Sequence, residues 1–172
     1  RDFDLFHFVE SVADQRLPTR SITDRAMQWI RDSGESKMLV FMHYYDVHSD
    51  YLSLPKYENL LVSPYDGRVD GSTWQLNLAS LPEAYIEGCQ IDPDEKRCRF
   101  GAGPTSHLVD ASVTKLEFAE KDLQHLEELY DAGIRQLDDE LGRFFAFLQN
   151  TGRIENARIV ITSDHGEEFL EH

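Results

Sequence analysis

Two polar clusters, each placed just after an apolar run, carry the side chains best suited to chemistry. His48 follows the run 38–42, while Asp164 and His165 follow the β-branched run 158–162. A carboxylate oxygen and an imidazole nitrogen are common ligands of divalent cations. A nearby histidine can donate a proton to a leaving group or bind an oxyanion. The residue types therefore predict a metal-assisted site, provided that the fold brings the clusters together.

The adjacent residues Asp164 and His165 have two interpretations. On a continuing strand their side chains would point to opposite faces, but Gly166 allows the backbone to turn, so that both can reach one ion. The alternative is a solvated turn capped by the aspartate, because such triplets also occur by chance. The position after a predicted strand favours the metal interpretation, since ligands of open α/β sheets bind beyond the carboxyl ends of strands.

The other titratable groups near the clusters also have alternatives. His48 is either a proton donor or an ordinary histidine of a surface loop. His43, one residue past its apolar run, is expected to pack or to support a ligand rather than to react. The first turn of a helix, where the macrodipole favours negative charge, is the predicted setting of Glu167, Glu168 and Glu171.

Two helices and two strands are predicted to position these clusters. Apolar residues recur every three or four positions in 21–33 and in 118–150, as in amphipathic helices. The short apolar runs 38–42 and 158–162 predict strands buried on both faces. The order helix, strand, excursion, helix, strand is typical of an α/β fold with a mostly parallel sheet flanked by helices. We expect both clusters at one edge of that sheet.

Residues 49–116 are the least regular part of the sequence and are predicted to form an irregular excursion around the site rather than sheet. A short helix is expected within 76–85. Cys89 and Cys98 either form a small disulfide loop, which would favour an exported protein, or remain free thiols. Their C-x8-C spacing lacks the close ligand pairing of zinc sites.

The charge of the chain argues against one class of partner. Its 172 residues carry 32 acids against 17 bases, a formal net charge of -15, which repels phosphate backbones and disfavours nucleic-acid binding. No run of about 18 apolar residues exists, so no membrane span is predicted within the chain. The start at Arg1, without Met or leader, is interpreted as cut or processed. Localisation stays open, with an exported protein favoured, and the oligomeric state stays open too.

Several motifs in order resemble the sulfatase family of the alkaline phosphatase superfamily. "SDHGEEFLEH" resembles its C-terminal metal motif, and "FMHYYDVHSDYLSLPKYENL" resembles an upstream aromatic-rich strand that ends in a histidine. "LYDAGIRQLDDELGRFFAFLQNTG" matches the helix before the last metal strand, and "YDGRVDGS" is similar to a segment of bacterial members. The resemblance covers roughly residues 19–172 and points to the central and C-terminal part of a catalytic domain.

The resemblance implies an alkaline phosphatase-like α/β fold and a metal-dependent sulfuric ester hydrolase. Asp164 and His165 would ligate one divalent cation, and His48 would contact the sulfate or the leaving oxygen of a small-molecule or carbohydrate sulfate ester. Calcium is the usual ion of sulfatases, whereas an imidazole ligand leaves manganese or zinc open, because calcium prefers oxygen ligands. No residue is predicted to bind an organic cofactor.

Some family features are missing from the sequence. No Asp-Asp strand precedes residue 19, and Asp138–Asp139 lies in mid-helix. Neither Cys89 nor Cys98 begins the Cys-x-Pro-x-Arg motif that matures to formylglycine. We therefore expect 1–172 to be an incomplete domain, with the nucleophile strand and the C-terminal subdomain outside it. The chain alone is expected to be inactive, because it lacks a nucleophile.

Two other functions remain open. A phosphodiesterase, phosphatase or phosphoethanolamine transferase of the same superfamily would use a Thr or Ser nucleophile where a sulfatase uses formylglycine. A non-catalytic interaction module with the same fold would have lost the nucleophile altogether. An upstream Asp-Asp strand followed by the Cys-x-Pro-x-Arg motif would exclude the module.

Overall fold

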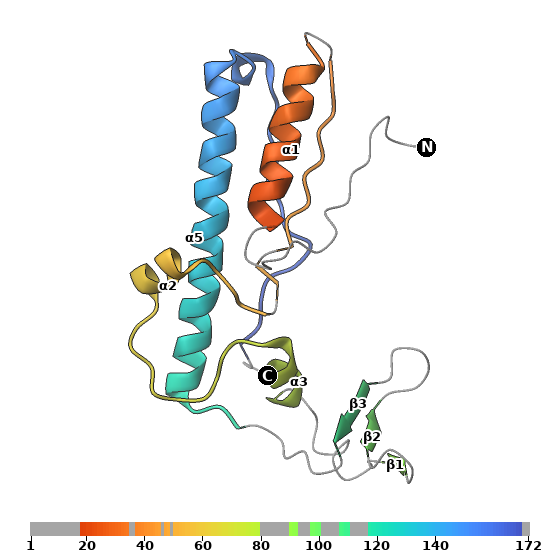
Figure 1. The fold of residues 1–172 in the computed structure, drawn as a ribbon, viewed down its shortest axis with the longest axis vertical. Coiled ribbons are helices and arrows are strands. Elements are labelled where there is room, and N and C mark those ends of the chain that lie inside the picture. Colours follow the sequence, from red (N-terminus) through yellow and green to blue (C-terminus); the bar gives the residue numbers. More distant parts are fainter. Residues whose placement is uncertain are drawn as a thin grey trace.

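Four helices dominate the computed structural model, which describes residues 18–34, 37–45, 47–48, 50–79, 90–92, 97–100, 107–110 and 117–169. The longest, α5 (Glu120–Asn150), lies beside α1 (Pro18–Asp32) over its second half (Figure 1). Helix α2 (Pro55–Leu61) packs against the middle of α5, and α3 (Thr73–Ala79) lies towards its start. A short 3-10 helix, η1 (Ile154–Asn156), follows α5.

The ends of α5 agree closely with the prediction of a helix over 118–150. At its start, the backbone N–H of Ala119 donates to the carboxylate of Asp122 at 2.8 Å, which satisfies a donor that the helix leaves unpaired. At its end, Gly152 adopts a φ of +67°, the left-handed conformation in which glycine commonly terminates helices. Helix α1 likewise stops before Gly34, with a φ of +59°, as predicted. It begins earlier than predicted, at Pro18, because proline suits a first helical turn.

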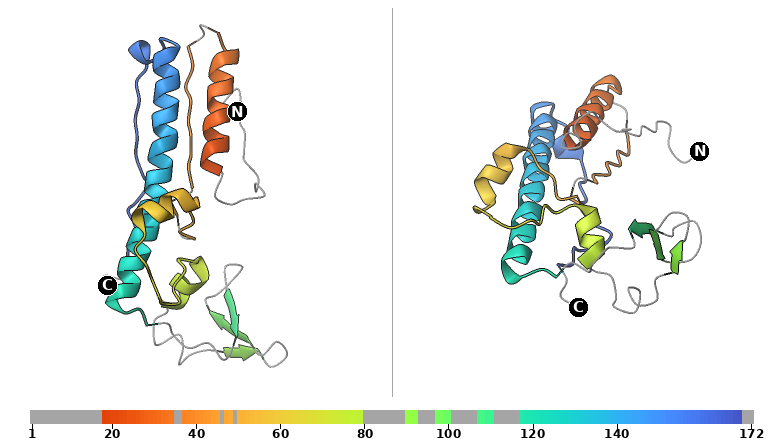
Figure 2. Two further views of the ribbon diagram at one scale, coloured as in Figure 1. Left: turned by 60° about the vertical axis from the view of Figure 1, so that its left-hand side comes forward. Right: turned by 60° about the horizontal axis from the view of Figure 1, so that its bottom comes forward.

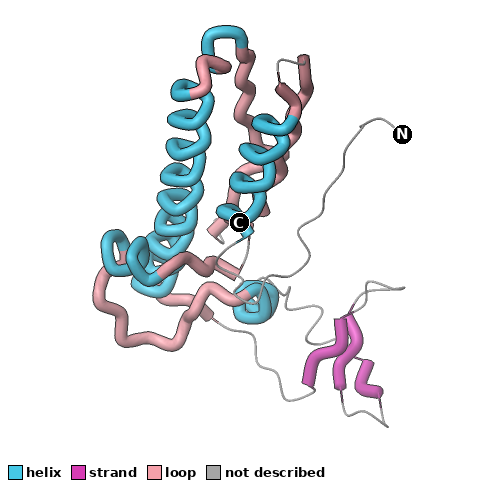
Figure 3. Tube along the Cα trace, turned by 45° about the horizontal axis from the view of Figure 1, so that its top comes forward, coloured by secondary structure: helices cyan, strands magenta, loops and turns pink. Residues whose placement is uncertain are grey.

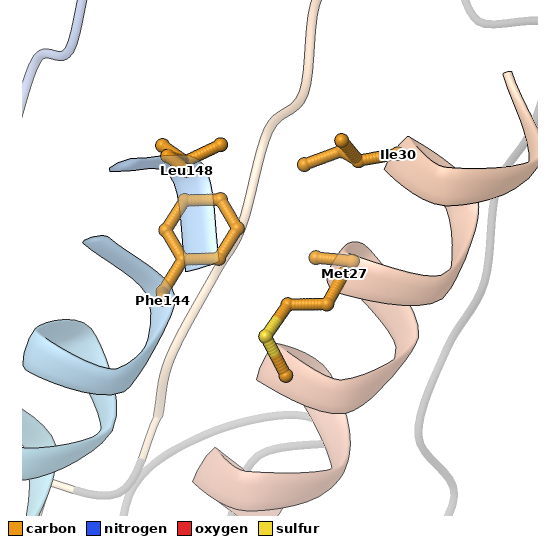
Figure 4. Packing of buried hydrophobic residues seen from close by; sticks show 5 residues of the cluster. Met27, Ile30, Phe144 and Leu148 are labelled. Atoms are coloured by element: carbon orange, nitrogen blue, oxygen red, sulfur yellow. The ribbon is translucent and has the colours of Figure 1, made fainter. Parts of the chain in front are cut away.

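One hydrophobic cluster joins α1 to the second half of α5. Met27 and Ile30 of α1 face Phe144 and Leu148 of α5, and all four are buried (Figure 4). Asp24 of α1 and Arg143 of α5 form an exposed ion pair beside this cluster. Apolar burial nevertheless supplies most of the attraction between the two helices.

A second cluster lies on the first half of α5. It centres on Leu126, which is 0% exposed, with Leu129 and Tyr51 packed beside it. The loop before α2 is tied to the same helix, because the backbone N–H of Leu54 donates to the side-chain oxygen of buried Gln136 at 2.8 Å. Helix α5 therefore carries two separate cores on one apolar stripe.

The two runs predicted as buried strands are loops in the structure, and this corrects the sequence prediction. Residues 37–45 and 157–163 lie outside any strand and run along the helix pair (Figures 2 and 3). In the first, burial alternates: Val40 and Met42 pack against the α1–α5 cluster, whereas Leu39 is 80% exposed. The second is exposed throughout. Alternation with one covered face is typical of a half-buried strand, so the prediction of burial on both faces is wrong here.

The described strands lie instead within the region predicted as an irregular excursion. β1 (Gln90–Asp92), β2 (Arg97–Phe100) and β3 (His107–Asp110) form a three-stranded antiparallel sheet in the order β1-β2-β3. No parallel strand pair occurs in the described stretches, so the predicted parallel sheet is not confirmed. Helix α3 overlaps the short helix predicted for 76–85. Cys89 and the disulfide alternative lie outside the described residues.

No helix within the described part of the chain is long and apolar enough to cross a bilayer.

The substitution Leu126→Ala tests the second cluster. Leu126 is fully buried, so the variant should lower the free energy of unfolding by about 3 kcal/mol, through lost burial and the cavity left behind. The control Leu60→Ala, at a side chain 67% exposed, should change it by less than about 0.5 kcal/mol. Denaturant titration measures both. Equal losses in the two variants would contradict this assignment of the core.

A stacked pair of rings holds the 62–69 loop on the start of α5. The rings of Tyr65 and His125 are 3.8 Å apart at an interplanar angle of 11°. The Tyr65 hydroxyl donates to Asp122, and the buried Nδ1 of His125 has no hydrogen-bond partner among the described residues. Burial lowers the pKa of His125, and the carboxylates of Glu128 and Asp122 oppose this shift only in part.

This contact should make stability depend on pH. The folded state binds a proton at His125 less readily than the unfolded chain does. The contribution of the neutral imidazole to the free energy of unfolding is therefore complete above the ordinary pKa of 6.5, and it is lost as pH falls below that value. Because this imidazole is partly exposed, the loss should stay below about 1 kcal/mol. When pH is lowered from 7.5 to 5.5, the denaturant midpoint should fall less for His125→Gln than for the parent protein. An identical pH dependence in both would refute the assignment.

Candidate functional site

Asp164 and His165, the predicted metal ligands, form a close pair on the exposed segment after η1. The Asp164 Oδ2 atom lies 3.7 Å from His165 Nε2. His165 Nδ1 lies 2.6 Å from the carbonyl oxygen of Gly166, which can only accept, so Nδ1 is the donor. In the neutral imidazole this leaves a lone pair on Nε2, the nitrogen nearer the carboxylate.

This geometry fits a divalent cation. Ligand atoms about 2.1 Å from one ion lie roughly 3.0–3.5 Å from each other, close to the observed separation. Metal-binding histidines commonly donate their second ring N–H to a backbone carbonyl, as His165 does to Gly166. Within the stretches that the structure describes, however, no group of three or more His, Cys, Asp or Glu side chains is placed to hold an ion. Asp164 and His165 can therefore supply two ligands of a larger set.

The electrostatics of the pair favour its charged forms. A hydrogen bond from its own backbone N–H, followed by the nearby imidazole of His165, lowers the pKa of Asp164. The hydrogen bond to the Gly166 carbonyl, followed by the Asp164 charge, raises the pKa of His165. The carboxylate is therefore ionised at neutral pH and available to a cation, whereas the imidazole must lose its extra proton before Nε2 can bind one.

His48, the predicted catalytic residue, stacks on Tyr45. The ring centroids lie 4.4 Å apart at 15°, and the backbone N–H of His48 donates to the Tyr45 carbonyl at 3.2 Å, which closes a turn. Further up the exposed face of the same segment, Tyr45 meets His43, and His43 meets Phe41, with centroids 6.2 and 6.4 Å apart. Alternating side chains thus place both histidines and two aromatic rings in one row.

His43 connects this row electrostatically, though weakly, to the Asp164–His165 pair. Its imidazole contributes, as the smallest of several effects, to lowering the pKa of Asp164. His43 and Asp164 therefore lie within electrostatic range of each other, although they belong to segments far apart in the sequence. The prediction that His43 packs or supports a ligand rather than reacting stays a prediction, and so does the catalytic role of His48.

Tyr51, Tyr130 and Phe169 form an aromatic cluster on the first half of α5. Tyr51 follows His48 closely in sequence, Tyr130 belongs to α5, and Phe169 follows the Asp164–His165 pair. Their ring centroids are 5.5–5.9 Å apart at tilted or edge-on angles, as aromatic side chains prefer. Tyr130 belongs to the periodic apolar stripe of α5. No local sequence pattern predicted that Tyr51 or Phe169 would pack against Tyr130.

The residues after Gly166 do not form the predicted helix. Residues 166–169 are loop, so Glu167 and Glu168 lie in no helical turn, and Glu171 lies outside the described residues. Glu167 instead lies within hydrogen-bonding reach of the Tyr51 hydroxyl. Burial, followed by the charge and hydrogen bond of Glu167, raises the pKa of Tyr51.

Comparison with known proteins gives consistent matches. The sulfatase family profile matches residues 8–172. Arylsulfatase K of Danio rerio is 30% identical over 158 residues, which is 88% of this chain and 28% of that protein. Arylsulfatase K of Gallus gallus is 29% identical over 88% of the chain and 27% of its own length. The multifunctional alkaline phosphatase superfamily protein PehA of Trinickia caryophylli is 24% identical over 87% and 27% respectively.

The chain spans little more than a quarter of the length of these curated relatives. No solved structure matches it. The family match covers nearly the whole sequence and includes both polar clusters, so it agrees with the motifs that the residues themselves display. The chain belongs to the sulfatase family.

Proposed function

We propose that the protein containing this chain is a metal-dependent sulfuric ester hydrolase, to which Asp164 and His165 contribute part of the metal site. Membership of the sulfatase family and the arylsulfatase relatives support the reaction class. The observation that carries the proposal is local: a carboxylate and an imidazole lie 3.7 Å apart, with the second imidazole nitrogen already bonded to a carbonyl. Such a pair needs only a small approach of its two ligand atoms, and a neutral imidazole, to bind a cation.

Each residue has a defined task in this proposal. Asp164 would provide one carboxylate oxygen and His165 its Nε2 atom to a divalent cation. When bound, that cation would neutralise charge on the ester oxygens and polarise the group under attack. His48 would donate a proton to the departing alkoxide, which is a poor leaving group without one. The nucleophile, expected to be formylglycine, and the remaining ligands would come from residues outside this chain.

The imidazole ligand bears on the identity of the ion. Calcium, the ion first expected from the family resemblance, prefers oxygen ligands, whereas manganese and zinc accept nitrogen readily. Titration of the purified protein with each ion separately would establish which one it binds.

Phosphoryl chemistry is the second candidate. The likeness to a multifunctional alkaline phosphatase superfamily protein favours it. The Asp164–His165 pair would serve either ester, so the pair itself does not distinguish the two candidates. Parallel assays with an aryl sulfate and an aryl phosphodiester would separate them.

Loss of either proposed ligand tests the metal assignment. In the complete protein, Asp164→Ala and His165→Ala should each lower kcat/KM for an aryl sulfate by about 100-fold or more, since a bound cation supplies several kcal/mol of transition-state stabilisation. Glu155→Ala, an exposed acid on η1, is the matched control and should leave turnover unchanged. Normal turnover by both ligand variants would show that the metal lies elsewhere.

A separate variant tests the proton donor. His48→Ala should lower kcat by about 100-fold or more while leaving the denaturant midpoint nearly unchanged, as expected for a general acid. The limb of the pH–rate profile that reports this acid should also disappear. A large loss of stability with little loss of kcat would identify His48 as a structural residue.

A further inference from the structure

We infer that Tyr51 is a positioning residue that fixes the segment 164–169 against α5. The inference rests on the proposed function in one respect only, because it assumes that the Asp164–His165 pair binds a cation. Tyr51 itself touches neither ligand and is no ligand in this account; it acts through the residues that follow the pair.

The burial pattern after η1 shows why this segment needs a fixed point. Ile154 packs against the α1–α5 cluster, and every residue from 155 to 168 is exposed. Phe169 is the next residue with partial burial, and it packs on the second cluster. Between these two apolar contacts, no described residue of the segment has a place in a core. The position of the metal pair therefore depends on where Phe169 is held.

Tyr51 and Tyr130 hold Phe169 from two sides. The Tyr51–Phe169 centroid distance is 5.9 Å, the Tyr130–Phe169 distance is 5.5 Å, and the two tyrosines are 5.6 Å apart. Tyr130 is fixed by its place on α5. Tyr51 is 3% exposed, so its ring has little room to move and presents a rigid surface to Phe169.

The backbone around Tyr51 is fixed as well. Its N–H donates to the carbonyl of Gly71 at 3.1 Å. A Cβ at Gly71 would lie 3.1 Å from the Tyr51 Cβ and 3.2 Å from a Leu129 methyl, so the chain passes here as closely as glycine permits. The neighbouring Asp50 carboxylate accepts from the backbone N–H of Thr73 at 2.7 Å. The ring that supports Phe169 therefore rests on a rigid frame.

A polar contact adds a second restraint nearer to the pair. The Tyr51 hydroxyl lies within hydrogen-bonding reach of Glu167, which lies between His165 and Phe169 in sequence. The same tyrosine follows His48 closely in sequence. Through its ring and its hydroxyl, this one side chain thus restrains the segment that carries the Asp164–His165 pair. Groups that hydrogen-bond directly to metal ligands commonly affect metal affinity about 10–100-fold. Tyr51 acts one step further from the ligands, so we expect an effect at the lower end of that range.

The test uses the complete protein with Mn²⁺ alone as the probe. Tyr51→Leu removes the ring and the hydroxyl, and Tyr51→Phe removes only the hydroxyl. Tyr57→Leu is the matched control, because Tyr57 is also a buried tyrosine, at 5% exposure, but lies on α2. Three quantities are measured for each variant: the Kd for Mn²⁺ by calorimetry, the amide hydrogen exchange of residues 164–169 without metal, and the thermal midpoint.

Tyr51→Leu should weaken Mn²⁺ binding about tenfold or more and should accelerate exchange in 164–169 several-fold. Tyr51→Phe, which keeps the ring contact, should show a smaller change of the same sign. Tyr57→Leu should lower the thermal midpoint yet leave both the Mn²⁺ affinity and the exchange of 164–169 at parental values. This pattern separates positioning from a general loss of stability.

The inference is overturned if Tyr51→Leu leaves exchange in 164–169 unchanged, or if Tyr57→Leu accelerates it equally. Should Tyr51→Leu fail to fold, Phe169→Leu supplies the same comparison from the other side of the contact, with the same expected result. Failure of the proposed function would look different: the parent protein would hydrolyse neither ester, while the metal-free exchange data would still decide the role of Tyr51.

Discussion

Packing against one apolar stripe of α5 holds the described segments that lead to the candidate site residues. The second half of this stripe buries Phe144 and Leu148 against α1, and the segment 37–45 covers the edge of that cluster with Val40 and Met42. The first half buries Leu126 among side chains that include Tyr51 and Phe169. The segments that lead to both polar clusters therefore pack on a single helix, although neither cluster lies on it.

The chemistry of the proposed site follows from its exposure as much as from its residue types. Asp164 and His165 are open to solvent, in a chain whose formal net charge is -15. An anionic ester approaches such a surface unfavourably unless a cation is bound, because only the ion reverses the sign of the local field. Substrate binding and metal binding should therefore be coupled, and the orientation of the carboxylate–imidazole pair influences both. In the proposed function, this coupling would be the reason for restraining the segment 164–169.

Local pattern predicted the helices well and the long-range contacts poorly. Helices α1 and α5 follow from the apolar periodicity of 21–33 and 118–150, since this signal acts within a few residues. The runs 38–42 and 158–162 were predicted as buried strands because apolar composition indicates that a segment prefers burial, but not which partner covers it. In the described structure one face of the first run is covered, and the second run is exposed.

The candidate site was likewise predictable from local sequence only in part. Residue type and position after an apolar run identified Asp164, His165 and His48 as candidates, and family resemblance supplied their proposed roles. Tyr51 and Phe169 escaped prediction because their meeting depends on the tertiary path of two loops, which leaves no periodic trace in the sequence. Only Tyr130, the third member of the aromatic cluster, occupied a predicted apolar position.

A crystal structure of the complete protein with Mn²⁺, located by anomalous scattering, tests the central claim most directly. We predict one manganese peak bonded to an Asp164 carboxylate oxygen and to His165 Nε2 at about 2.1–2.2 Å. The imidazole of His48 should face the open side of that ion, with Phe169 packed between the two tyrosines. A manganese peak elsewhere, or a His48 ring turned away across α5, would contradict the account.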